Sequence, residues 1–142
     1  MLSAQTYIDK IHDSRNFIFS KRQLRYRTDF PVYADLKKHS EALLTNLCKL
    51  VFVLSGMHFD GRSDNEIISY VECNYPIGVV VRNYIDSYNN WVMFSKRRDE
   101  SGKERYLRAI IGYSEVIENE IIDAFGLPLN YSLMTNFDTK RG

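Results

Sequence analysis

The residues best spaced for chemistry lie in the stretch from Arg82 to Tyr88. An arginine and a general base about one helical turn apart can hold a phosphate and move the proton of a 2′-hydroxyl. A little over one turn after Arg82 the chain carries Ser87, and a serine hydroxyl cannot act as a base near neutral pH. We therefore do not expect an enzyme. The simpler interpretation of Arg82 and Asn83 is the solvated face of an amphipathic helix.

This stretch resembles the signature of the HEPN superfamily of helical ribonucleases and nucleotide-binding partners, in which an arginine, often followed by a polar residue such as asparagine, precedes a histidine on one helix. The resemblance covers Arg82, Asn83 and the general bundle shape, and Ser87 departs from it. It implies an RNA-directed or toxin- and defence-related protein that is catalytically degenerate. Its nucleic-acid patch would combine Arg82 and Asn83 with basic loops that hold Arg25, Tyr26, Arg97 and Arg98, where a tyrosine ring between arginines can stack on a base.

A second stretch, Phe52 to Asp60, resembles the second-helix motif of Bcl-2-type proteins. In that family a large apolar residue stands four positions before a glycine and another stands three positions after it, as Phe52, Gly56 and Phe59 do here. The family's aspartate directly after the glycine is replaced by Met57. The resemblance implies a helical bundle that captures an amphipathic helix in a groove.

Aromatic residues are numerous, with ten tyrosines and eight phenylalanines among 142 residues. Rings of this kind either fill a core or supply contact area for a partner. For a protein-binding surface we expect an exposed edge of the fourth helix or the loop that follows the second helix; the candidates are Tyr84, Tyr88, Trp91, Met57 and Phe59. The interpretation that we favour is a non-catalytic protein-binding module of inhibitor, immunity, adaptor or helix-capturing type. The RNA-directed protein remains the alternative.

The sequence predicts no metal site and no cofactor. His12, His39 and His58 include no pair at the spacing of metal ligands. Glu115 and Glu118 stand one turn apart, as in the magnesium sites of helical nucleotide pyrophosphatases, but a neighbouring helix with matching carboxylates is missing. We interpret them as part of a solvated acidic face.

Composition narrows the class of protein further. The formal net charge is +1, from 19 basic and 18 acidic residues, which removes the bulk electrostatic argument for a dedicated nucleic-acid or membrane-surface binder. Cys48 and Cys73 are expected to be packing residues in a reducing compartment. No stretch approaches the roughly 18 apolar residues of a membrane span. We expect a soluble cytoplasmic protein without a membrane partner, and a homodimer stays open.

The hydrophobic period predicts helices over about 3–19, from Asp29 or Pro31 to Gly56, over 63–73, from Pro76 toward Lys96, and over about 102–125. Two serines each followed by a glutamate three residues later, at 63–66 and 101–104, are typical of capping boxes. Gly126 and Pro128 mark the end of the last helix.

These elements predict an all-α fold, an irregular bundle of four to five helices in a single compact domain over residues 1–142. Residues 127–142 have no period, and either a strap or a loose tail fits them. The competing prediction is a short strand over 77–81, where valine and isoleucine are dense.

Overall fold

The computed structural model describes residues 3–21, 30–96 and 100–127. They form five helices: α1 (Ala4–Lys21), α2 (Phe30–Leu54), α3 (Asp64–Asn74), α4 (Gly78–Ser95) and α5 (Glu100–Phe125). No strand occurs within these ranges. The prediction of an all-α bundle is therefore confirmed, and the competing strand over 77–81 is wrong because those residues enter α4.

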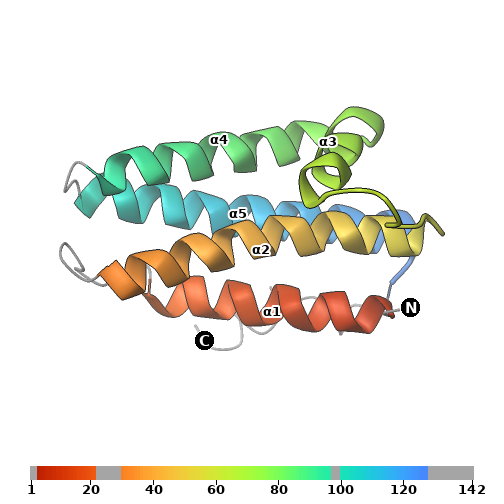
Figure 1. The fold of residues 1–142 in the computed structure, drawn as a ribbon, viewed down its shortest axis with the longest axis horizontal. Coiled ribbons are helices and arrows are strands. Elements are labelled where there is room, and N and C mark those ends of the chain that lie inside the picture. Colours follow the sequence, from red (N-terminus) through yellow and green to blue (C-terminus); the bar gives the residue numbers. More distant parts are fainter. Residues whose placement is uncertain (1–2, 22–29, 97–99, 128–142) are drawn as a thin grey trace.

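Four long helices run along the long axis of the molecule, and the short helix α3 lies at one end (Figure 1). α1 and α2 pack as one antiparallel pair and α4 and α5 as another. α2 also packs on α5, which joins the two pairs, and α3 fills the space beside α2 and α4. Short connections favour this neighbour-on-neighbour topology.

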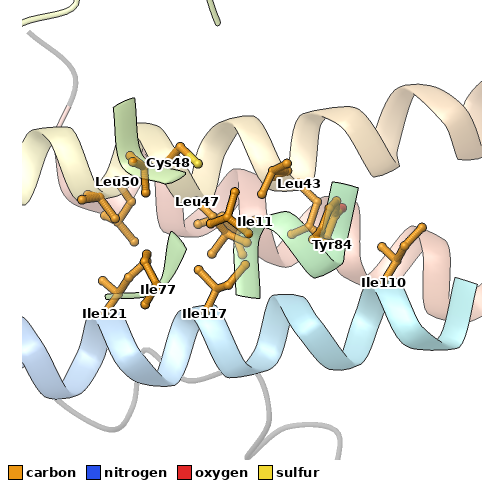
Figure 2. Close-up of a cluster of buried hydrophobic side chains, with 14 of the residues drawn as sticks. Ile11, Leu43, Leu47, Cys48, Leu50, Ile77, Tyr84, Ile110, Ile117 and Ile121 are labelled. Carbon is orange, nitrogen blue, oxygen red and sulfur yellow. The ribbon is translucent and has the colours of Figure 1, made fainter. Parts of the chain in front are cut away.

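The core is built from the apolar faces that the sequence predicts. Leucines of α2 and isoleucines of α1 and α5 are buried, together with Tyr84 and Trp91 of α4. Figure 2 shows Leu47 and Ile117 pointing into the space between α2 and α5, with Ile11 of α1 beside them. Expulsion of water from these faces is the main stabilising term, because each fully buried Leu or Ile side chain contributes about 1.5–3 kcal/mol.

The first predicted capping box is confirmed at the start of α3. The Ser63 Oγ accepts a hydrogen bond from the Glu66 amide at 3.2 Å, and the Ser63 amide donates to the Glu66 carboxylate at 3.4 Å. These bonds satisfy donors that a helix start leaves without partners. The start of α3 is thus fixed locally, by two residues that lie close together in the sequence, Ser63 and Glu66.

The second predicted capping box is wrong in its position. α5 begins at Glu100, so Ser101 lies inside the helix and is not its N-cap. The Glu104 carboxylate pairs with Arg108, one turn further along the helix. An i,i+4 ion pair competes with the backward reach that a capping box needs.

Two helices end at a glycine, as predicted. Gly56 and Gly126 have φ angles of 72° and 66°, a left-handed conformation that other residues rarely adopt. After each glycine an amide donates to the carbonyl five residues earlier, from Met57 to Phe52 at 2.9 Å and from Leu127 to Ile122 at 3.0 Å. This is the Schellman arrangement, which satisfies the last carbonyls of a helix.

The junction between α3 and α4 differs slightly from the prediction, because α4 begins at Gly78 and not at Pro76. Tyr75, Pro76 and Ile77 form a turn in which the Gly78 amide donates to the Tyr75 carbonyl at 2.9 Å. A Cβ atom at position 78 would overlap the carbonyl group of Glu72. Only glycine lets the two helices approach this closely.

None of the helices in the described ranges combines the length and apolar content required to cross a bilayer. Glu118, which is predicted on a solvated face, is buried at 4 % exposure, and two further polar residues, Ser87 and Lys103, are buried at 8 % and 3 % exposure. Four predicted nucleic-acid residues, Arg25, Tyr26, Arg97 and Arg98, and the segment 128–142 lie outside the described residues.

Candidate functional site

A half-open cavity of about 520 Å³ lies between α2, the start of α3 and the middle of α4. Its described lining residues are Ser40, Glu41, Leu44, Thr45, Ser63, Asp64, Asn65, Ile68, Tyr84, Ile85, Tyr88 and Asn89. The volume falls in the range of about 300–1,000 Å³ that is usual for ligand sites. The cavity exists because α3 is short and lies across one end of the bundle.

The inner wall of the cavity is rigid. Tyr84 is buried, and its hydroxyl donates to the Ser40 carbonyl at 2.6 Å, which ties α4 to α2. Burial raises the pKa of the Tyr84 phenol well above its usual value, so the donor stays protonated. Leu44, Ile68 and Ile85 add apolar surface to this wall.

Tyr88 and Glu41 form one side of the cavity. Burial raises the pKa of the Tyr88 phenol, and the charge of Glu41 together with a hydrogen bond to its side chain raises it further. The phenol therefore stays protonated and donates to the carboxylate. Tyr88 is half-buried and Glu41 is exposed, so this pair places part of an aromatic ring and a negative charge where the cavity meets solvent.

The start of α3 supplies the opposite side of the cavity. Asp64 is exposed and pairs with Lys49, with 3.1 Å between Oδ1 and Nζ. A carboxylate accepts about four hydrogen bonds, so one ion pair does not saturate it. Ser63 caps the helix, and its hydroxyl is engaged with Glu66.

Ser40 lies at the bottom of this arrangement, with a buried side chain whose hydroxyl has no hydrogen-bond partner among the described residues. A buried hydroxyl without a partner costs about 1–3 kcal/mol. The Ser40 Oγ is closed off from the solvent in the cavity, so a ligand reaches it only when the wall moves. No pattern in the sequence indicates this hydroxyl, because Ser40 falls on the apolar face of α2, where a side chain is expected in the core.

The cavity contains two of the predicted protein-binding residues. Tyr84 and Tyr88 line it, and Trp91 does not. The prediction that all three rings lie at an exposed edge is wrong, because Tyr84 and Trp91 are 1 % and 0 % exposed. Trp91 stacks on Tyr33 of α2, with ring centroids 5.3 Å apart. Tyr84 and Trp91 lie on the inner face of α4. The Trp91 indole is therefore part of the core.

The other two predicted protein-binding residues pack against the bundle instead of lining the cavity. Phe59 is half-buried and contacts the rings of Tyr7 and Phe52, with centroids 5.8 and 6.0 Å apart. The Met57 sulfur lies 3.8 Å from the Tyr75 hydroxyl. Met57 and Phe59 therefore cover the end of α2, whereas Tyr84 and Tyr88 line the cavity. The predicted protein-binding surface is divided between these two places.

The described residues of the alternative nucleic-acid patch are Arg82 and Asn83, and both are exposed. The Arg82 guanidinium lies 3.7 Å from a Glu72 oxygen and 3.3 Å from an Asp86 oxygen. These neighbouring carboxylates offset the positive charge that a phosphate would need. Ser87, which stands where the HEPN histidine would, is buried at 8 % exposure.

A buried polar cluster joins α1 to α5. Arg15 is fully buried and donates from Nη1 to Glu118 Oε2 at 3.0 Å and from Nε to Ser114 Oγ at 3.0 Å. The His12 Nε2 lies 3.7 Å from the other Glu118 oxygen. The prediction that Glu118 belongs to a solvated face is wrong. The sequence did contain an indication of this buried contact, because Glu118 lies next to Ile117 on the apolar face of α5 and Arg15 interrupts the apolar face of α1.

Neither cysteine nor any acidic group is arranged for metal chemistry in the described part of the chain, where no cluster of three or more His, Cys, Asp or Glu could hold an ion. Burial raises the pKa of the Cys48 thiol to about 12, so it is a poor nucleophile near neutral pH. Cys73 is exposed on α3.

Comparison of the chain with protein-family models, with curated proteins and with solved structures finds no match.

Proposed function

We propose that this protein is a non-catalytic binding module that captures a protein partner through the cavity between α2, α3 and α4. The observation that carries the proposal is a half-open cavity of about 520 Å³ whose described lining combines buried apolar and aromatic side chains with carboxylate, amide and hydroxyl groups. Pockets of this composition bind a protruding group and orient it with a few polar contacts. Tyr88 is the aromatic anchor, because its ring is half-buried at the boundary with solvent.

A binding role fits this lining better than a catalytic one. The two tyrosines have pKa values raised above their usual range, so neither acts as a base near neutral pH. The Ser40 hydroxyl is buried, and the described lining residues include no histidine or lysine that could activate it as a nucleophile. A serine nucleophile needs such a base.

The protein-binding role also fits the chain better than the RNA-directed alternative. The described lining carries the carboxylates of Glu41 and Asp64 and no basic side chain, and these carboxylates repel phosphate. Arg82 lies in ion pairs on the outer face of α4. The basic loops of the alternative remain predictions.

The test blocks the cavity without disturbing the core. Asn89 is exposed and lines the cavity, so Asn89→Arg places a long side chain across it. Asn83→Arg makes the same change on the same helix, at an exposed position outside the lining. Each immobilised protein is incubated with nuclease-treated lysate of its source cells, and captured proteins are quantified by mass spectrometry.

We expect at least one protein to be captured by the wild type and by Asn83→Arg and to be lost with Asn89→Arg. The proposal is overturned when no captured protein distinguishes the two variants. A species captured only from lysate that has not been treated with nuclease supports the RNA-directed alternative. Circular dichroism checks that both variants keep the helical content of the wild type.

A further inference from the structure

We infer that the cavity between α2, α3 and α4 recognises an arginine side chain of the partner, held by Glu41 and Asp64 and stacked on Tyr88. This inference rests on the proposed function and deepens it by naming the chemistry of the group that enters. It combines the charge of the lining, the acceptors that line the cavity and the position of one aromatic ring.

The charge of the cavity selects a cation. Glu41 of α2 and Asp64 of α3 stand on different elements that line the same cavity, and the described lining includes no lysine, arginine or histidine. Lys49, which is not part of the lining, lies 3.1 Å from one oxygen of Asp64. Glu41 accepts its hydrogen bond from a neutral phenol, so its negative charge is not cancelled by that contact.

The start of α3 does not turn the cavity into an anion site, although helix N-termini attract anions. The Glu66 amide already donates to the Ser63 hydroxyl, and the Ser63 amide donates to the Glu66 carboxylate. Acidic side chains at positions 64 and 66 fill the first turn of α3. The dipole and part of the donors at this helix start are therefore compensated from within the chain.

The acceptors of the lining fit the donors of a guanidinium. Arginine carries five N–H donors in a planar fork, whereas lysine carries a compact charge that is more strongly hydrated. Beside the two carboxylates the lining offers the side-chain oxygens of Asn65 and Asn89.

Tyr88 supplies the remaining element of the site. Its ring is half-buried beside Glu41, and a guanidinium lying on a tyrosine ring gains a cation–π contact while its edge meets carboxylates. Leu44 and Ile85 in the same lining fit the methylene stem of an arginine. Each part of the side chain thus meets a surface of matching polarity.

The test uses small probes and an isotope-labelled protein. N-acetyl-arginine amide, N-acetyl-lysine amide and N-acetyl-citrulline amide are titrated in turn, and amide chemical shifts are recorded by NMR. Citrulline has nearly the shape of arginine and no charge. Proteins are the wild type, Glu41→Gln, and Glu120→Gln, an exposed carboxylate on α5 outside the lining.

We expect arginine to cause saturable shifts in residues 40–45, 63–68 and 84–89, and salt to weaken its binding. Citrulline should bind more weakly by about tenfold, and Glu41→Gln should weaken arginine binding by about tenfold, because a charge-assisted hydrogen bond is lost. Glu120→Gln should leave arginine binding within about twofold of the wild type. Equal binding of citrulline or of lysine, or the absence of saturable shifts at the cavity, overturns the inference.

Failure of this inference is distinguishable from failure of the proposed function. When Asn89→Arg abolishes capture of a partner but Glu41→Gln captures it normally and no arginine probe binds, the function stands and the arginine assignment falls. When blocking the cavity changes no captured protein, the proposed function itself is lost.

Discussion

Arg15 and Glu118 form an ion pair in the interior of the bundle, with 3.0 Å between Nη1 and Oε2 and both side chains at or below 5 % exposure. The pair connects α1 to α5, which are far apart in the sequence. Two further bonds from the same guanidinium reach Ser114, at its Oγ and its carbonyl oxygen. The charge and the hydrogen-bond donors of Arg15 are thus matched by acceptors on α5. This match requires one particular alignment of α1 along α5.

Breaking this pair from one side should be far more damaging than removing it. Arg15→Met leaves Glu118 buried without its cation, and we expect the free energy of unfolding to fall by about 3–5 kcal/mol. The double variant Arg15→Met with Glu118→Leu should recover part of that loss, because no uncompensated charge remains. Urea denaturation of both single variants and the double variant measures the coupling.

Arg82→Met is the matched control, since it removes an arginine from exposed ion pairs with Glu72 and Asp86. Its effect should stay within about 0.5 kcal/mol. A loss of stability in Arg15→Met no larger than in Arg82→Met would contradict a structural role for the buried pair.

Trp91 should behave as a core residue. The indole is fully buried and stacks on Tyr33, so Trp91→Ala should lower the free energy of unfolding by about 3–5 kcal/mol. Met93→Ala, at a position that is 39 % exposed on the same helix, should have little effect. Thermal unfolding followed by circular dichroism compares the two, and equal melting temperatures would show that the indole is not part of the core.

Alanine substitutions at two glycines, Gly78 at the α3–α4 junction and Gly112 in α5, should change the stability in opposite directions. Gly78→Ala drives a methyl group into the Glu72 carbonyl, and relief of that overlap should cost about 1–3 kcal/mol of stability. Gly112→Ala, in the interior of α5 with open space around it, should stabilise by about 0.5–1 kcal/mol because alanine favours the helix. Chemical denaturation of both variants tests the prediction, which fails when the two shift the midpoint in the same direction.

His39 should make stability depend on pH in the acidic range. Its ring stacks on Phe17, with centroids 4.3 Å apart, and its Nδ1 lies 3.2 Å from the Ser14 hydroxyl. Burial lowers the pKa of His39 below 6.5, and Lys38 lowers it further, against the opposing effect of Asp35 and Asp13. The unfolded chain therefore binds a proton first as the pH falls.

The contribution of His39 is fully present above pH 6.5 and is lost as the pH falls toward its lowered folded value, by at most about 1.4 kcal/mol per pH unit. NMR titration should give His39 a pKa below that of the denatured chain. His39→Gln should flatten the dependence of unfolding free energy on pH. A His39 resonance that titrates above 6.5 would reverse the sign.

Much of the architecture was predictable from local patterns. The Ser63–Glu66 capping box, the left-handed glycines at 56 and 126 and the apolar period of α2 each depend on residues within a few positions of one another. The predictions were wrong where the position of a residue depends on more than the pattern of its nearest neighbours in the sequence. Ser101 lies inside α5 because the helix starts earlier, and Ser87 and Trp91 are buried because α2 and α5 cover their side of α4.

The sequence by itself determined that five helices form, and it fixed the start of α3 and the glycine ends of α2 and α5, since these follow from hydrogen bonds and side-chain period within single segments. Only the tertiary structure decided that Glu41, Asp64 and Tyr88 line one cavity and that Arg15 meets Glu118. These groups belong to different helices, and their distances depend on how the helices cross and where α3 lies. No spacing along the chain encodes such a meeting, because it arises when separate apolar faces pack together.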